Sequence, residues 1–189
     1  MGDAKRRANE IARLKGRVDA WRAGLSTEER LISDVAERLD ARLVRGMPFT
    51  EGCYHLAFFM THHLALQGVT VKPVIGWIND GLWDGVASHA WIEYEGKITD
   101  TSLTCTSHPE VAPTGALIVQ GFVLRPGQAS YTYFQNDDPN AARMRQWVGS
   151  QPKWASIQAH KEAEHQKMLQ IAQDGLLENY LDMAPAGGR

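Results

Sequence analysis

Several features that define other protein classes are scarce in this sequence of 189 residues. Only two cysteines occur, Cys53 and Cys105, too few for a disulfide scaffold or for a zinc site with four cysteine ligands. The longest apolar run, residues 115–124, is interrupted by Gln120 and falls far short of the ~20 residues that a membrane-spanning helix needs. The sequence therefore predicts a globular protein without a membrane span, in which any functional cysteine is a free thiol.

An excess of positive charge is also missing. The net charge is -2 and the sequence pI is about 6.4, whereas nucleic-acid-binding domains usually carry a strongly basic face. The first ten residues, MGDAKRRANE, are charged where a secretory signal has an apolar segment. We therefore expect no nucleic-acid partner, no membrane association and a cytoplasmic location.

The length and composition fit one folded domain over residues 1–183. The N-terminal part has apolar residues at helical spacing, and Ser26 and Glu29 form a capping box between two such stretches. The predicted parts are a helical hairpin at 5–45, an α+β core at 50–135, a polar C-terminal helix at 150–183 and a flexible tail at 184–189.

The predicted core starts with one helix and continues with strands. The helix begins at Cys53 and ends near Gly68. Turn-forming residues separate the apolar β-type segments that follow, which predicts an antiparallel sheet. The expected strands are 71–77, 86–94, 97–103, 115–124 and 129–134, the last two joined across Arg125, Pro126 and Gly127.

Two residues of this core can perform nucleophilic chemistry together. Cys53 begins its helix, where unpaired N–H groups and the helix dipole favour the thiolate, which is the reactive form of cysteine. His89 lies in the second strand and can take and return protons near neutral pH. The pattern favours a thiol nucleophile with an imidazole partner.

The hairpin after His89 provides a third group. If Glu95 and Gly96 form a two-residue turn, Trp91 lies opposite Asp100 on the neighbouring strand. Since side chains alternate between faces, Asp100 then lies diagonally across from His89, at roughly 7 Å between their backbones. A carboxylate at that position can orient the imidazole through a hydrogen bond.

These motifs carry a resemblance to a known family. The helix from Cys53 to Gly68, the segments PVIGW at 73–77 and HAWIE at 89–93, and Asp100 together resemble the core of the transglutaminase-like superfamily, which is related in layout to papain-type thiol enzymes. The resemblance covers residues 50–103. The short connection from His89 to Asp100 looks most like the small leader-peptidase branch associated with lasso-peptide maturation.

The resemblance implies a fold and a set of roles. The fold is α+β, with a transglutaminase-like or papain-like core in which N-terminal helices and a catalytic helix pack on an antiparallel sheet, followed by a C-terminal helix. Cys53 is the implied nucleophile, His89 the general acid and base, and Asp100 the orienting carboxylate. We expect a cysteine-dependent amide-bond enzyme acting on a protein or peptide, as a peptidase, deamidase or transamidase, with no cofactor and no metal.

Other interpretations stay open. Trp77 and Trp83 flank a loop and Trp91 follows His89, so all three are expected to contact substrate, with ordinary packing as the alternative. A non-catalytic protein-binding module could keep the same fold and bind a partner protein through its charged helical flanks. A zinc site is the third interpretation, although Cys53 and His55 point about 200° apart around a helix.

Overall fold

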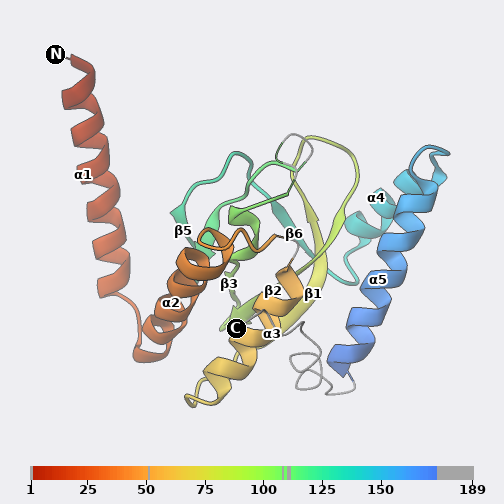
Figure 1. Cartoon of the computed structure of the whole chain (residues 1–189), viewed down its shortest axis with the longest axis horizontal. Helices are drawn as coiled ribbons and strands as arrows, with labels where there is room; N and C mark the ends of the chain where they lie inside the picture. Colours follow the sequence, from red (N-terminus) through yellow and green to blue (C-terminus); the bar gives the residue numbers. More distant parts are fainter. Residues whose placement is uncertain (1, 51, 108, 110–111, 174–189) are drawn as a thin grey trace.

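The computed structural model describes residues 2–50, 52–107, 109 and 112–173, and it combines helices with antiparallel strands (Figure 1). The predicted α+β class is therefore confirmed. The helices are α1 (Gly2–Ala23), α2 (Thr27–Leu39), the π-helical turn η1 (Asp40–Val44), α3 (Cys53–Ala65), the 3-10 turn η2 (Ser102–Thr104), α4 (Pro139–Ser150) and α5 (Ala155–Gln173). The strands are β1 (Lys72–Asn79), β2 (Ala87–Tyr94), β3 (Lys97–Thr99), β4 (Leu117–Val119), β5 (Phe122–Arg125) and β6 (Thr132–Gln135).

The two N-terminal helices form where the sequence predicts them. The Ser26 side chain accepts a hydrogen bond from the Glu29 N–H, and the Glu29 side chain accepts one from the Ser26 N–H, so the predicted capping box starts α2. Figure 1 shows α1 diverging from α2 rather than lying along it. The C-terminal end of α1 contacts the rest of the chain, where Trp21 stacks on Phe122 and Arg22 pairs with Glu37.

The larger sheet has the strand order β3-β2-β1-β6, with all neighbours antiparallel. The turn at Glu95 and Gly96 has positive φ at both residues, which matches the right-handed twist of the flanking strands. It pairs Tyr94 with Lys97, as predicted. This turn fixes the register of β2 against β3, and hence the face on which His89 lies.

Alternation along β2 divides its side chains between two faces. Ala90 and Ile92 belong to the main apolar core, together with Ala57 and Phe58 of α3 and with Ile75 of β1. The face with Ala90 and Ile92 therefore packs against α3, while His89 and Trp91 belong to the opposite face. Burial of this apolar surface is the main favourable contribution to the fold.

The strand predicted at residues 115–124 is wrong. Gln120 and Gly121 have φ values of 50° and 71°, which is turn geometry, and the segment folds into the separate hairpin of β4 and β5. The strand predicted at 129–134 is present as β6, but it pairs with β1 at the far edge of the larger sheet instead of with the preceding strand.

The C-terminal region also differs from the prediction. The helix α4 was not expected, although Asp138 caps its first turn and Pro139 occupies the position that favours proline. The predicted helix at 150–183 begins later, at Ala155. Residues 174–183 and the predicted tail at 184–189 lie outside the described residues. Within the residues described, no helix has both the length and the apolar character to cross a membrane.

Candidate active site

Cys53 is the first residue of α3, as predicted. The preceding residue, Gly52, is the N-cap and contributes no side chain that caps the helix. The N-terminal end of a helix presents backbone N–H groups and a partial positive charge, which favour an anion at this position. Cys53 is half-buried and forms no disulfide, and neither does Cys105.

His89 and Asp100 lie in contact, as the hairpin register predicts. The Nε2 atom of His89 is 2.7 Å from Oδ2 of Asp100, and only 3% of His89 and 2% of Asp100 is exposed. Regular pairing of β3 with β2 stops at Thr99, and Asp100 pairs instead with Ile118. The chain therefore leaves the edge of β2 where Asp100 meets the imidazole.

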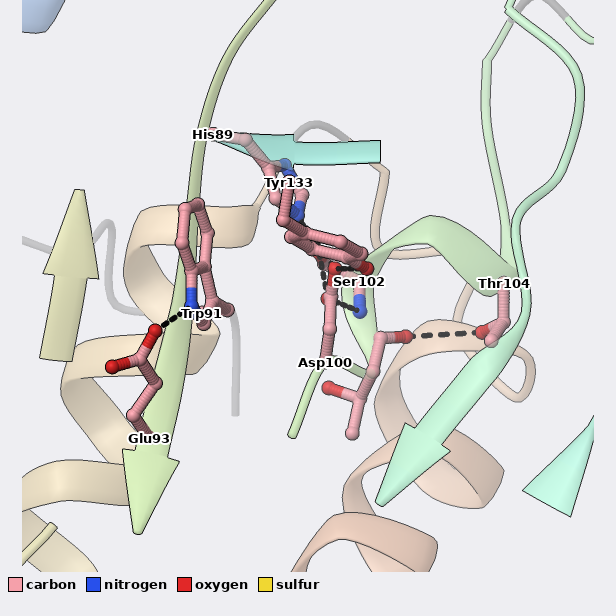
Figure 2. Close-up of polar contacts among 8 residues, drawn as sticks. His89, Trp91, Glu93, Asp100, Ser102, Thr104 and Tyr133 are labelled. Atoms are coloured by element: carbon pink, nitrogen blue, oxygen red, sulfur yellow. Dashed lines mark hydrogen bonds and ion pairs between the residues drawn. The ribbon is translucent and has the colours of Figure 1, made fainter. Parts of the chain in front are cut away.

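Two groups from other elements also donate hydrogen bonds to Asp100. The Tyr133 hydroxyl on β6 donates to Oδ2 at 2.7 Å. Ser102 on η2 donates to Oδ1 from its backbone N–H at 2.9 Å and from its hydroxyl at 2.7 Å. Figure 2 shows His89, Tyr133 and Ser102 converging on this carboxylate. Burial alone would raise the pKa of Asp100, but the charge of His89 and these hydrogen bonds lower it, so the carboxylate stays ionised.

His89 is held in its protonated form. Burial alone would lower its pKa, but the charges of Asp100 and Cys53 and hydrogen bonds with both side chains raise the pKa to about 10. Because Nε2 faces Asp100, Nδ1 is the ring nitrogen left for the sulfur. An imidazolium ion beside a thiol favours the thiolate.

Trp91 fixes the imidazole from the side. Its ring lies nearly parallel to that of His89 with centroids 6.3 Å apart, and edge-on to Tyr133 with centroids 5.2 Å apart. Its indole N–H donates to Glu93 Oε1 at 3.0 Å. Gly76 of β1 lies under the indole, and a Cβ there would be 2.5 Å from the ring and even closer to the backbone carbonyl oxygen of Phe134 on β6. The absence of a side chain at Gly76 therefore makes room for Trp91.

A small cavity lies beside Cys53, between α3 and β2. Its lining includes Cys53, Ala90, Asp100 and Ser102. The volume is about 10 Å³, which is close to the least that a single water molecule needs. The interior of the site is therefore packed, and a substrate has to approach Cys53 from its exposed side.

The three tryptophans expected to bind substrate have different environments. Trp77 is completely buried, on the face of the sheet away from His89, and Trp91 is only 1% exposed. Neither ring offers surface to a substrate. Trp83 is 43% exposed, in the loop between β1 and β2. The Asn79 side chain donates to the backbone carbonyl of Trp83 at 2.8 Å, which fixes this loop.

Tyr133 and Ser102 belong to the site although the sequence did not predict them. The sequence Asp100-Thr101-Ser102 could have indicated Ser102, because an aspartate commonly accepts a hydrogen bond from the N–H two residues later. No local signal indicates Tyr133, because its contact depends on the pairing of β6 with β1. Among the described residues no group of three or more histidine, cysteine, aspartate or glutamate side chains could hold a metal ion.

The comparisons with known proteins do not identify a relative. No family model matches the chain, and neither the curated proteins nor the solved structures contain a match.

Proposed function

We propose that the chain is a cysteine-dependent amide-bond enzyme of transglutaminase-like type, acting as a peptidase or deamidase on a protein or peptide. Cys53 is the nucleophile, His89 the general acid and base, and Asp100 the carboxylate that orients the imidazole. The observation that carries the proposal is the buried pair of His89 and Asp100, 2.7 Å apart, interacting with a cysteine at the start of a helix. A buried ion pair next to a half-exposed thiol is costly to build for stability alone.

The first half of the reaction forms a thioester. The Cys53 thiolate attacks the carbonyl carbon of the amide, and the oxygen takes the negative charge. The backbone N–H of Cys53 at the helix start is the donor best placed for that oxygen. His89 gives its proton to the departing nitrogen as the C–N bond breaks, and ammonia or an amine leaves.

The second half restores the enzyme. The neutral imidazole takes a proton from water as the water oxygen attacks the thioester carbonyl. The C–S bond then breaks, and the products are a carboxylic acid, the Cys53 thiolate and the protonated His89. An amine in place of water would give transamidation, so the acceptor alone distinguishes the two outcomes. Throughout the cycle Asp100 remains ionised and bonded to Nε2.

Alkylation by iodoacetamide at pH 7 tests the activated thiol. Mass spectrometry of the digested protein separates Cys53 from Cys105, which is also free and half-buried and therefore serves as an internal reference. We expect Cys53 to react at least about tenfold faster than Cys105 and to lose that advantage in a His89→Ala variant. Equal, slow labelling of Cys53 in both proteins would contradict the proposal.

A non-catalytic binding module is the second candidate, and α1 favours it. This helix projects from the other elements in Figure 1, and Leu14 on it is 45% exposed. A projecting helix leaves its surface open to a partner, and helices that dock into a groove on another protein are a common mode of recognition. Replacement of Cys53 by Ser distinguishes the two functions: a binding module keeps its cellular role, whereas the enzyme loses it without a change in melting temperature.

A further inference from the structure

A second buried histidine, His165 on α5, forms a chain of hydrogen bonds on the opposite side of the sheet from His89. Its Nδ1 atom is 2.5 Å from the Ser88 hydroxyl, and its Nε2 atom is 2.7 Å from Oδ1 of Asn136. The Ser88 hydroxyl is also 2.5 Å from the hydroxyl of Tyr54. His165 is completely buried, so these contacts replace water for a polar side chain that would otherwise lose its hydrogen bonds.

The protonation state of His165 determines which group donates in each hydrogen bond of this series. Burial, with a smaller effect of the nearby Arg145 charge, lowers the pKa of His165 to about 4, so the ring is neutral at neutral pH. The Nε2–H group donates to the carbonyl oxygen of Asn136, which leaves Nδ1 as an acceptor. Ser88 then donates to Nδ1, and Tyr54 donates to the Ser88 oxygen. Each of the three hydrogen bonds in this series then has one donor and one acceptor.

The ring of His165 is also fixed by packing. It stacks on Trp77 of β1, with centroids 3.9 Å apart and an angle of 23° between the planes. The Arg145 guanidinium on α4 lies over the Trp77 ring, 4.4 Å from its centroid. The imidazole therefore has little freedom to rotate, and its Nδ1 atom is a fixed anchor for Ser88.

The two residues at the other end of the chain are neighbours of the proposed catalytic pair. Tyr54 directly follows Cys53 at the start of α3, and Ser88 directly precedes His89 on β2. The hydrogen bond between Tyr54 and Ser88 thus joins the backbone that carries the sulfur to the backbone that carries the imidazole. Small displacements of reacting groups reduce rates strongly.

We propose that His165 is a positioning residue, which sets the approach of Cys53 to His89 through Ser88 and Tyr54. The proposal rests on the proposed function, because it assigns a role relative to that catalytic pair. It also gives the C-terminal helix a role, because α5 carries His165 and so adds a polar contact to the apolar packing of α3 on β2. His165 touches no reacting atom, so its contribution is geometric.

Two substitutions of His165 separate the bond to Ser88 from the remaining contacts. In His165→Asn the amide oxygen can take the place of Nδ1 and accept from Ser88. In His165→Gln the amide lies at the distance of Nε2, so the bond to Asn136 can form while the bond to Ser88 is lost. Both variants remove the ring that stacks on Trp77, so their melting temperatures are expected to fall by similar amounts.

The measurement is the rate of Cys53 alkylation by iodoacetamide from pH 5 to 9, with Cys105 as the reference thiol. We expect His165→Asn to stay within about twofold of the wild type. We expect His165→Gln to be about tenfold slower at pH 7, with labelling that rises toward alkaline pH as for an ordinary thiol. The rate of alkylation at pH 7 can fall by about 30-fold at most, since a thiol with an ordinary pKa near 8.5 is only about 3% ionised at that pH. Equal labelling in the two variants would overturn the positioning role.

Two further variants keep the test decisive. Ser88→Ala removes the same bond without opening a space beside Trp77, and it should slow labelling as much as His165→Gln does. Wild-type labelling in Ser88→Ala overturns the proposal even if the His165 variants fail to fold. His89→Ala tells the two proposals apart: if it labels like the wild type, the proposed function fails, and if it is slow while Ser88→Ala is not, the positioning role alone fails.

Discussion

Replacing Asp100 by Asn tests the charge at the centre of the site. The variant keeps the shape of the side chain and one carbonyl oxygen, but it loses the negative charge of Asp100, which is the largest of the effects that raise the pKa of His89 to about 10 against burial; Cys53 and the hydrogen bond with Asp100 supply the others. At pH 7 the imidazole then releases its proton rather than remain as an unpaired buried charge. At pH 7, a pKa of about 10 for His89 in the folded chain corresponds to about 4 kcal/mol of the free energy of unfolding. Removing one member of a buried ion pair generally costs about 3–5 kcal/mol, which agrees.

Unfolding and labelling at pH 7 measure the two consequences of Asp100→Asn. A loss of about 4 kcal/mol in a chain of this size lowers the melting temperature by about 8–16 °C. Without the imidazolium ion, alkylation of Cys53 should slow by more than about tenfold, toward the rate of an ordinary thiol. Both effects come from the same charge and should appear together.

A second buried carboxylate provides the matched control. Asp40 is 1% exposed and accepts hydrogen bonds from Arg125 at 2.7 and 3.0 Å, from Arg45 at 2.8 Å and from Thr104 at 2.6 Å. Asp40→Asn should destabilise the fold to a similar extent and leave Cys53 labelling near the wild-type rate. The reasoning is refuted if Asp100→Asn destabilises the protein but labels at the wild-type rate, or if Asp40→Asn slows labelling equally.

Three further predictions concern the surroundings of the site. Tyr133→Phe removes one donor to the Asp100 carboxylate and should cost about 1.5–3 kcal/mol, the range for hydrogen bonds to charged groups; urea unfolding would show it, and an unchanged midpoint would contradict it. Gly76→Ala places a Cβ 2.5 Å from the Trp91 ring and should cost about 1–3 kcal/mol in the same assay, whereas a stabilised variant would be inconsistent with the packing. Burial lowers the pKa of His165 to about 4, below the value of about 6.5 for a histidine in the unfolded chain. Between these two pH values the unfolded chain binds a proton that the folded chain does not, so the free energy of unfolding is highest above pH 6.5 and falls as the pH falls. At pH 4.5 the free energy of unfolding should be about 2.5 kcal/mol lower than above pH 6.5 because of His165. His165→Gln should lack this part of the pH dependence, and identical acid unfolding profiles of the variant and the wild type would disprove it.

The hairpin at Glu95 and Gly96 shows how much of the site can be predicted from local sequence. A two-residue turn determines the pairing of Tyr94 with Lys97, and alternation then determines which side chains share a face. This count of residues places Asp100 on the His89 side of the hairpin, and the hydrogen bond between them forms where the chain leaves β2 after Thr99 and Asp100 pairs with Ile118. The start of α3 at Cys53 is equally local, because it depends on residues within one helical turn.

The hairpin at Gln120 and Gly121 shows where the same reasoning failed. Periodicity alone cannot distinguish a continuous apolar strand from two short strands with a turn. The error also misplaced β6, which pairs with β1 far away in the sequence. The pairing of strands that are far apart in the sequence depends on which surfaces pack best once the long loops between them have closed. A local sequence pattern does not indicate which pairing is the most stable.

The sequence by itself determined the order of thiol, imidazole and carboxylate along the chain and the short-range geometry that aligns the last two, because turns and helix ends depend on neighbouring residues. Only the tertiary structure decided that Tyr133 bonds to Asp100 and that His165 reaches Ser88. Those contacts join positions 33 and 77 residues apart. They exist because burial of apolar surface brings β6 and α5 against the central strands, and buried polar groups there must find partners.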